Sequence, residues 1–148
     1  MIVYHGSNLE IRNPDCFHSR KTVDFGPGFY VTPILEQARN WAAKFKRRSE
    51  PAVVSRYALN DQVLTSSRAL HFDTYSEEWL DFIIACRAGN VPADYDVIMG
   101  GVANDRVFDT MNLYLEALIS KRDALERLKY YKPNYQICLK RQSLIDLI

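Results

Sequence analysis

The stretch Gly26-Pro27-Gly28-Phe29-Tyr30-Val31-Thr32-Pro33 holds the signals for a turn, a strand and a helix start in direct succession. Glycine and proline predict a tight turn, and the aromatic and β-branched residues that follow predict a short strand over 28–32. Thr32 as N-cap and Pro33 in the first turn then predict the start of a helix. Apolar residues continue at helical spacing and predict a helix face that packs on the core, made of Ile34, Leu35, Ala38, Trp41, Ala42 and Phe45.

Outward from this stretch, strand and helix patterns alternate without a regular repeat. Further strands are expected over 2–4, 52–59, 69–72, 95–99 and 135–139. Further helices are expected over 79–86 behind a capping box at Thr74 and Glu77, over 107–119, and over 120–129 behind a capping box at Ser120 and Asp123. Short strands without a βαβ rhythm predict an α+β fold with a mixed or antiparallel sheet. No linker divides the chain, so we expect a single domain over 1–148.

The composition is that of an ordinary globular domain and names no partner. The chain has 148 residues, of which 47% are apolar and 12% aromatic, and this composition excludes collagen-like and disordered classes. The 19 Lys and Arg nearly balance the 18 Asp and Glu. No apolar run reaches the roughly 18 residues that span a bilayer, and the opening residues turn polar too soon for a signal peptide. We therefore expect a cytoplasmic protein, in its own cell or delivered into another. Three cysteines without a C-x-x-C pair indicate reduced thiols, and the three histidines have no metal-ligand spacing, so no metal is expected.

Motifs for phosphate loops, dinucleotide-binding turns, serine hydrolases and zinc peptidases are absent from the sequence. What remains is His5-Gly6-Ser7 at a strand end, Gly28-Phe29-Tyr30 on the next strand, Trp41 on the following helix and Gln136 on the last strand. In this order they resemble the ADP-ribosyltransferase superfamily, in its diphtheria-toxin-like and poly(ADP-ribose)-polymerase-like branch. That branch has a His-Tyr-Glu signature, which here reads His-Tyr-Gln. Small bacterial toxin-like members with an antitoxin partner are the most similar.

The resemblance implies a split sheet core with flanking helices and a site for NAD as co-substrate. His5 would bind the adenosine-side ribose, and the backbone of Gly6 would meet the nicotinamide carboxamide, which a Cβ would obstruct. Ser7 would cap the turn or bond the amide. Tyr30 and Trp41 would sandwich the cationic pyridinium ring. The resemblance thus implies a mono-ADP-ribosyltransferase that cleaves the nicotinamide–ribose bond and modifies a protein or a nucleic acid, as the toxin of a toxin–antitoxin pair.

Gln136 departs from the family, because many members have Glu at this place on the last strand. The amide carbonyl can accept a bond from the ribose 2′-OH, but it cannot offset charge or abstract a proton. A single transfer or NAD hydrolysis is therefore favoured over chain elongation, and a Gln136→Glu variant is expected to cleave NAD at least as fast. A carboxylate from elsewhere, Asp24 or Asp105, would compensate, although Asn104 and Asp105 are also typical of a helix N-terminus.

Each of these residues also has a structural interpretation. Trp41 and Tyr30 would then fill the core, Gly6 and Ser7 would form a turn, and the chain would be a catalytically silent domain that binds a nucleotide or a partner. An NAD glycohydrolase is a further alternative. The enzymatic hypothesis expects His5, Tyr30, Trp41 and Gln136 to converge on one cleft, with Tyr135 directed to the other face of its strand.

Overall fold

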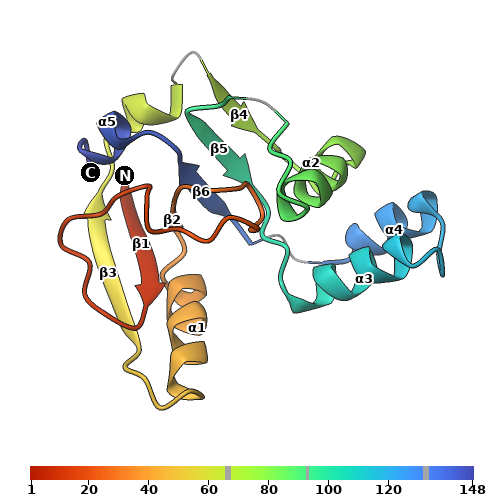
Figure 1. The fold of residues 1–148 in the computed structure, drawn as a ribbon, viewed down its shortest axis with the longest axis horizontal. Helices are drawn as coiled ribbons and strands as arrows, with labels where there is room; N and C mark the ends of the chain where they lie inside the picture. Colours follow the sequence, from red (N-terminus) through yellow and green to blue (C-terminus); the bar gives the residue numbers. More distant parts are fainter. Residues whose placement is uncertain (66–67, 93, 132–133) are drawn as a thin grey trace.

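The computed structural model describes residues 1–65, 68–92, 94–131 and 134–148. Its strands in these ranges are β1 (Ile2–Ser7), β2 (Phe29–Val31), β3 (Val53–Ala58), β4 (Ala69–His71), β5 (Val97–Gly100) and β6 (Gln136–Leu139). Its helices are α1 (Leu35–Lys46), α2 (Glu77–Arg87), α3 (Asp105–Leu115), α4 (Lys121–Leu128) and α5 (Gln142–Ile145), with a 3₁₀ helix over Asp61–Thr65 (Figure 1). The expected strands and helices all occur, with boundaries that differ by a few residues.

The strands form two sheets. β1 and β3 pair antiparallel in a small sheet, and a larger sheet has the order β2-β6-β5-β4. The larger sheet is mixed, because β4 and β5 are parallel while its other pairs are antiparallel. A single bridge between Tyr4 and Thr32 joins the two sheets. The expected α+β class with mixed and antiparallel pairing is therefore confirmed.

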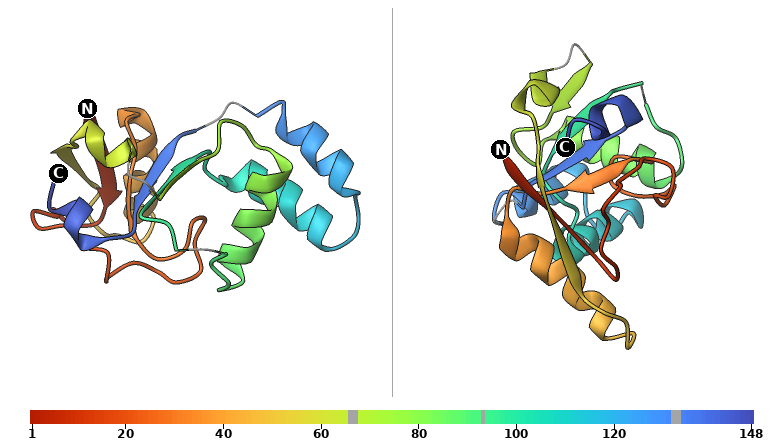
Figure 2. Two further views of the ribbon diagram at one scale, coloured as in Figure 1. Left: turned by 90° about the horizontal axis from the view of Figure 1, so that it is seen from above. Right: turned by 90° about the vertical axis from the view of Figure 1, so that its left-hand side faces the viewer.

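Each face of the larger sheet has its own apolar core. One core includes Ile98 and Cys138 of the sheet with Trp79 of α2 and Met111 of α3. The other core packs the opposite face of the sheet against the small sheet and α5, and includes Val3, Phe29, Ile137, Leu139 and Ile145. Figure 2 (left) shows the small sheet and α1 on one side of β6, with α2, α3 and α4 on the other.

Helix α1 differs from the sequence-based expectation in its start and in its buried face. It begins at Leu35, because the Thr32 hydroxyl accepts the Ile34 N–H at 3.1 Å in a turn before the helix. Its buried residues are Ala38 and Ala42, whereas Trp41 is 41% exposed and Ile34 40% exposed. The placement of Ile34 and Trp41 in the core is therefore wrong.

The reason is the close approach of α1 to β1. A Cβ built on Gly6 would lie 2.3 Å from the backbone oxygen of Ala38 and 3.0 Å from the nitrogen of Ala42. Only small side chains on the helix and no side chain at Gly6 permit this contact. The residues that pack on β1 are therefore the two alanines, while Ile34 and Trp41 remain exposed.

Capping residues explain the other helix starts. Ser76, rather than Thr74, caps α2 by accepting the Trp79 N–H, so the capping box expected at Thr74 is wrong. Asn104 caps α3, and Ser120 with Asp123 forms the expected capping box of α4. Cys16, Cys86 and Cys138 are all free thiols.

We predict that Gly6→Ala destabilises the fold by about 1–3 kcal/mol or more, because the new methyl group overlaps helix backbone that cannot rotate away. Urea unfolding followed by circular dichroism measures this change. Ala43→Ser, on the exposed face of the same helix, serves as the control and should change the unfolding free energy little. Equal midpoints for wild type and Gly6→Ala would contradict the helix–strand contact.

Candidate functional site

The two sheets separate immediately after the bridge between β1 and β2. The N–H and C=O of Tyr4 pair with those of Thr32 at 2.8 and 2.9 Å. Continued antiparallel pairing would place Gly6 opposite Tyr30. Instead, Nδ1 of His5 lies 2.6 Å from the carbonyl oxygen of Tyr30, and the His5 ring stacks on Phe29 with ring centroids 4.8 Å apart. We name this opening, between Gly6 and Tyr30 with His5 inserted, the β1–β2 split.

The bond to Tyr30 fixes the tautomer of His5. A carbonyl oxygen only accepts, so Nδ1 of His5 must carry the proton. Burial lowers the pKa of His5 from its ordinary value, against a smaller opposing contribution from the bond to Tyr30. The ring is therefore neutral near pH 7, and its Nε2 has a free lone pair that can accept a hydroxyl proton.

Gly6 contributes the backbone edge of the split. In an antiparallel strand, both polar groups of one residue point to the same edge, and successive residues alternate. The groups of Gly6 therefore point to the same edge as those of Tyr4, away from β3, and they have no backbone partner within the described residues. Gly6 is buried. A buried N–H and C=O without partners are unusual, and they can bind a ligand that offers one acceptor and one donor.

The reason for a glycine at position 6 differs from the expected one. The direction that a Cβ would take faces the backbone of α1 at Ala38, so the helix contact excludes a side chain. The Ser7 hydroxyl donates to the Leu9 carbonyl at 2.6 Å and closes the turn after β1. Ser7 therefore has the turn-forming role that the sequence left open.

Tyr30 holds the loop that precedes its own strand. Its hydroxyl accepts the Phe25 N–H at 3.0 Å and donates to the Gly26 carbonyl at 2.6 Å. Its ring stacks on Phe25 with centroids 6.5 Å apart, and burial raises the pKa of its hydroxyl far above the usual range. The phenol is therefore a structural contact and no proton donor for chemistry near neutral pH.

Side chains from other parts of the chain also bond to the loop before β2. Nζ of Lys140 donates to the carbonyls of Phe25 and Pro27 at 2.9 and 2.8 Å, and the Ser19 hydroxyl accepts the Gly28 N–H at 2.9 Å. The loop that carries Asp24 is consequently held at several points.

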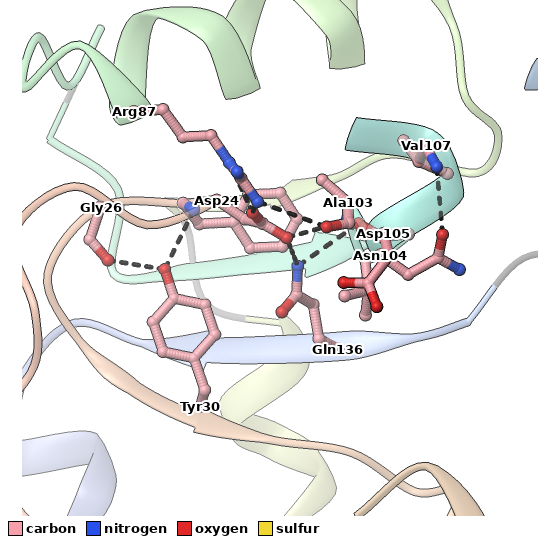
Figure 3. Close-up of polar contacts among 12 residues, drawn as sticks. Asp24, Gly26, Tyr30, Arg87, Ala103, Asn104, Asp105, Val107 and Gln136 are labelled. Carbon is pink, nitrogen blue, oxygen red and sulfur yellow. Dashed lines mark hydrogen bonds and ion pairs between the residues drawn. The ribbon is translucent and has the colours of Figure 1, made fainter. Parts of the chain in front are cut away.

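Asp24 lies at the centre of a buried polar network and is only 7% exposed (Figure 3). Its Oδ1 accepts from Nε and Nη2 of Arg87 at 3.0 and 2.5 Å. Its Oδ2 accepts the Ala103 N–H and the Nε2 of Gln136, each at 2.9 Å. Of the two carboxylates considered from sequence, Asp24 is thus the one that contacts Gln136.

Gln136 is 8% exposed, and its amide has one allowed orientation. Nε2 faces two acceptors, the Asp24 carboxylate and the Gly101 carbonyl at 3.4 Å, so the NH₂ group must point to them. Oε1 then points away from Asp24, on the Tyr30 side in Figure 3, and has no protein partner within the described ranges. A buried acceptor without a donor is a candidate contact for a ligand hydroxyl.

Trp41 lies at the surface of α1 beside two charged groups. Nζ of Lys44 is 4.5 Å from the centroid of the Trp41 ring, and it also lies 3.8 Å from the carboxylate of Asp105 at the start of α3. The Asp105 side chain is 93% exposed. It is a surface ion-pair partner and not the carboxylate beside Gln136.

A side-chain amide ties α1 to the start of β6. Gln37 donates to the Tyr135 carbonyl and accepts the Tyr135 N–H, both at 3.0 Å. Trp41 follows Gln37 by one helical turn and lies on the same helix face. The Tyr135 side chain points to His71, at 3.3 Å from its Nε2, and so away from Gln136 as expected from strand alternation.

The structure brings the sequence-derived residues together only in part. His5, Gly6 and Tyr30 meet at the β1–β2 split, and Gln136 lies on the same sheet face as Tyr30, since Tyr30 pairs with Cys138 two residues further along β6. The His5 ring lies on the opposite face of the larger sheet, against Phe29. The expectation of one cleft lined by four side chains is therefore wrong, because His5 and Gln136 lie on opposite faces of the sheet, and this placement contradicts a single ribose site that touches both.

Sequence reasoning missed Arg87 and the N–H of Ala103. Arg87 follows the apolar run 79–86 at the end of α2, and an arginine there is also typical of a helix C-terminus. Only the burial of Asp24 shows that it needs a cation. Arg87 is 63 residues from Asp24, so no local pattern joins them.

The described residues contain no cluster of three or more His, Cys, Asp or Glu side chains that could hold a metal ion. Their helices are too short or too polar to cross a membrane.

A family model described as "Protein of unknown function (DUF3990)" matches residues 1–148, the whole chain. The chain belongs to the DUF3990 family. Comparison of this DUF3990 chain with curated proteins and with solved structures gives no match.

The lowered pKa of His5 predicts how the stability of this DUF3990 domain depends on pH. The unfolded chain takes up a proton near the ordinary value of 6.5, whereas the folded chain resists until a lower pH. Unfolding is therefore increasingly favoured as the pH falls through 6.5 toward the folded pKa, and the penalty is absent above 6.5.

His5→Asn is the matched variant, because its Nδ2 can still donate to the Tyr30 carbonyl but does not titrate. The measurement is the melting temperature of both proteins between about pH 5 and pH 8, a range that brackets the ordinary histidine pKa. Wild type should lose stability relative to His5→Asn on the acidic side. A difference that does not vary with pH would show that His5 is not held neutral.

Proposed function

We propose that this domain is an ADP-ribosyltransferase that binds NAD across the β1–β2 split and cleaves its nicotinamide–ribose bond. The observation that carries the proposal is that the N–H and C=O of buried Gly6 have no backbone partner at the split among the described residues. A primary carboxamide offers one acceptor and a donor NH₂ group, which complement this pair. The order of the motifs from His5 to Gln136 supports the same assignment.

Two side chains of the candidate site have acceptors suited to ribose hydroxyls. Nε2 of His5 and Oε1 of Gln136 are both placed to accept hydroxyl protons. They lie on opposite faces of the larger sheet, which counts against one ligand that contacts both, and the proposal keeps Gln136 as the acceptor that faces the reacting ribose. Gln136 would then contact the ribose on which positive charge develops as nicotinamide leaves.

Trp41 supplies an aromatic surface that is already occupied by a cation. The ammonium of Lys44 lies over its ring at 4.5 Å. The nicotinamide ring of NAD is also cationic, so it can replace the ammonium in the same kind of attraction. Tyr30 contributes less to such a stack than the sequence suggested, because its ring is packed on Phe25.

The acceptor of ADP-ribose in this proposal is a macromolecule, a protein or a nucleic acid. By resemblance to small bacterial members, the domain would act as a cytoplasmic toxin held by an antitoxin protein. A catalytically silent nucleotide-binding domain is the second candidate, and the neutral amide of Gln136 in place of a carboxylate favours it. An NAD glycohydrolase differs from the first candidate only in using water as acceptor.

Incubation with adenine-labelled NAD and a cell lysate separates these candidates. Label that becomes bound to macromolecules supports the transferase, and its release by protease or by nuclease identifies the acceptor class. Label found only in free ADP-ribose supports the glycohydrolase. Unchanged NAD would contradict both enzymatic candidates.

We predict that NAD stabilises the domain and that Trp41 takes part in binding. NAD at about 100 times its dissociation constant adds roughly 2.7 kcal/mol to the free energy of unfolding, which corresponds to several degrees in a thermal shift. Trp41→Ala should reduce this shift. Tyr130→Ala, which removes an aromatic side chain that is 88% exposed elsewhere, is the control and should retain it. A flat melting curve up to millimolar NAD would contradict the proposal.

We predict that Gln136→Ala impairs cleavage more than binding. Oε1 would act mainly where charge develops in the transition state, and loss of one such polar contact in other enzymes costs roughly 10²–10³-fold in rate. Release of nicotinamide measures cleavage, and calorimetry measures NAD affinity, which should change little. If wild type and variant cleave NAD equally fast, Gln136 is not the residue that faces the reacting ribose.

A further inference from the structure

We infer that Asp24, braced by Arg87, is the positioning residue that presents Oε1 of Gln136 to the substrate. The inference rests on the proposed function, because it assigns a role within that site. Asp24 comes from the loop before β2, Arg87 from the end of α2, and Gln136 from the start of β6. The hydrogen-bond network at Gln136 therefore joins three separate elements.

Among the described residues, every hydrogen bond to the Asp24 carboxylate comes from a donor: two guanidinium nitrogens of Arg87, the N–H of Ala103 and the NH₂ of Gln136. A carboxylate that accepts at both oxygens from four donors has a fixed position. It is also fully used, so it has no role as a base toward an incoming acceptor.

The Gln136 side-chain amide is held in one of its two possible orientations. A 180° rotation would place Oε1 of Gln136 at about 2.9 Å from Oδ2 of Asp24 and close to the Gly101 carbonyl, an arrangement without any hydrogen bond. The amide therefore keeps Oε1 directed away from Asp24. A free glutamine would sample both orientations, so Asp24 removes a misoriented population before any ligand binds.

The charge of the Asp24 carboxylate is shared between Arg87 and the Gln136 amide. The guanidinium of Arg87 lies on Oδ1 and the amide on Oδ2, so the negative charge of Asp24 is largely neutralised at a distance. Its effect on the reaction is then to orient and polarise the amide, which makes Oε1 a stronger acceptor. It does not replace the full charge of the glutamate found in many family members.

This arrangement changes the expectation for Gln136→Glu. A glutamate there would place a second carboxylate beside Asp24, and two carboxylates that share a site cannot both ionise easily. The variant would hold a proton or displace Arg87. We therefore expect Gln136→Glu to cleave NAD more slowly than wild type, in contrast to the expectation from sequence.

The kinetic test is a double-mutant cycle between Asp24 and Gln136. Asp24→Asn should lower kcat for NAD cleavage about ten- to hundredfold, the scale expected when a reacting group is misplaced, with KM for NAD little changed. In a Gln136→Ala background, the same substitution should lower kcat no further. Equal, additive losses in both backgrounds would show a merely structural role and would overturn the inference.

Asp96→Asn is the matched control for lost stability. Asp96 is 16% exposed in its side chain and pairs with Arg68 and Arg141, so its loss also breaks a network of ion pairs, but one without contact to Gln136. Its kcat should equal that of wild type. If Asp24→Asn fails to fold, Asp24→Leu combined with Arg87→Met removes both charges together, which is tolerated better than one unpaired charge.

An NMR measurement tests the positioning independently of turnover. The Gln136 side-chain NH₂ protons should exchange slowly with water in wild type and Asp96→Asn, and rapidly in the Asp24 variants. Unchanged exchange would overturn the inference even if wild type cleaves NAD. Altered exchange in a protein that neither binds nor cleaves NAD would instead refute the proposed function, and with it the catalytic purpose of the positioning.

Discussion

The buried carboxylate of Asp24 is the constraint on which the site depends. A charge at 7% exposure is tolerated only when it is paired and hydrogen-bonded. Here the guanidinium of Arg87, the N–H of Ala103 and the amide of Gln136 meet that requirement. These partners come from α2, from the segment before α3 and from β6. The cost of burying Asp24 thus fixes the relative positions of three elements that share no sequence pattern. The loop before β2 gains its shape from the same requirement.

A second constraint is the separation of the two sheets. In a continuous sheet, the carbonyl of Tyr30 would be bonded by the backbone of β1, but a histidine side chain provides that donor instead. The strands can then diverge without leaving this acceptor unpaired. Because α1 packs closely on β1, the backbone at Gly6 has no room for a side chain on the helix side.

Local patterns were sufficient to predict most of the fold. The strands around Tyr30 and Ile137 and the capped starts of α3 and α4 follow from residues close in sequence, and the structure has them. Helical spacing on α1 also identified an apolar face, but it could not identify which part of that face would be covered. The contact of Ala38 with Gly6 decides this, and it depends on the tertiary position of β1.

The candidate site was predictable to a lesser extent. Its motif residues could be named from the sequence, because Tyr30 and Gln136 lie in predicted strands, His5 directly follows one, and Trp41 lies in the first predicted helix. The network around Gln136 was not found, because Arg87 is 49 residues from it in the chain and belongs to an otherwise apolar helix. The faces of the larger sheet on which His5 and Gln136 lie were also beyond sequence reasoning, because they follow from how the two sheets meet.

The position of Lys44 over Trp41 makes recognition at this ring an exchange of cations. A positively charged ring that stacks on Trp41 must first displace an ammonium, so the net gain is the difference between two cation–π contacts. The displaced ammonium still has the carboxylate of Asp105 beside it, and its release leaves no unpaired charge. A neutral aromatic ring would lose the cation–π attraction and supply only stacking and dispersion in its place. Under the proposed function, the surface of α1 would therefore favour a cationic ring over a neutral one.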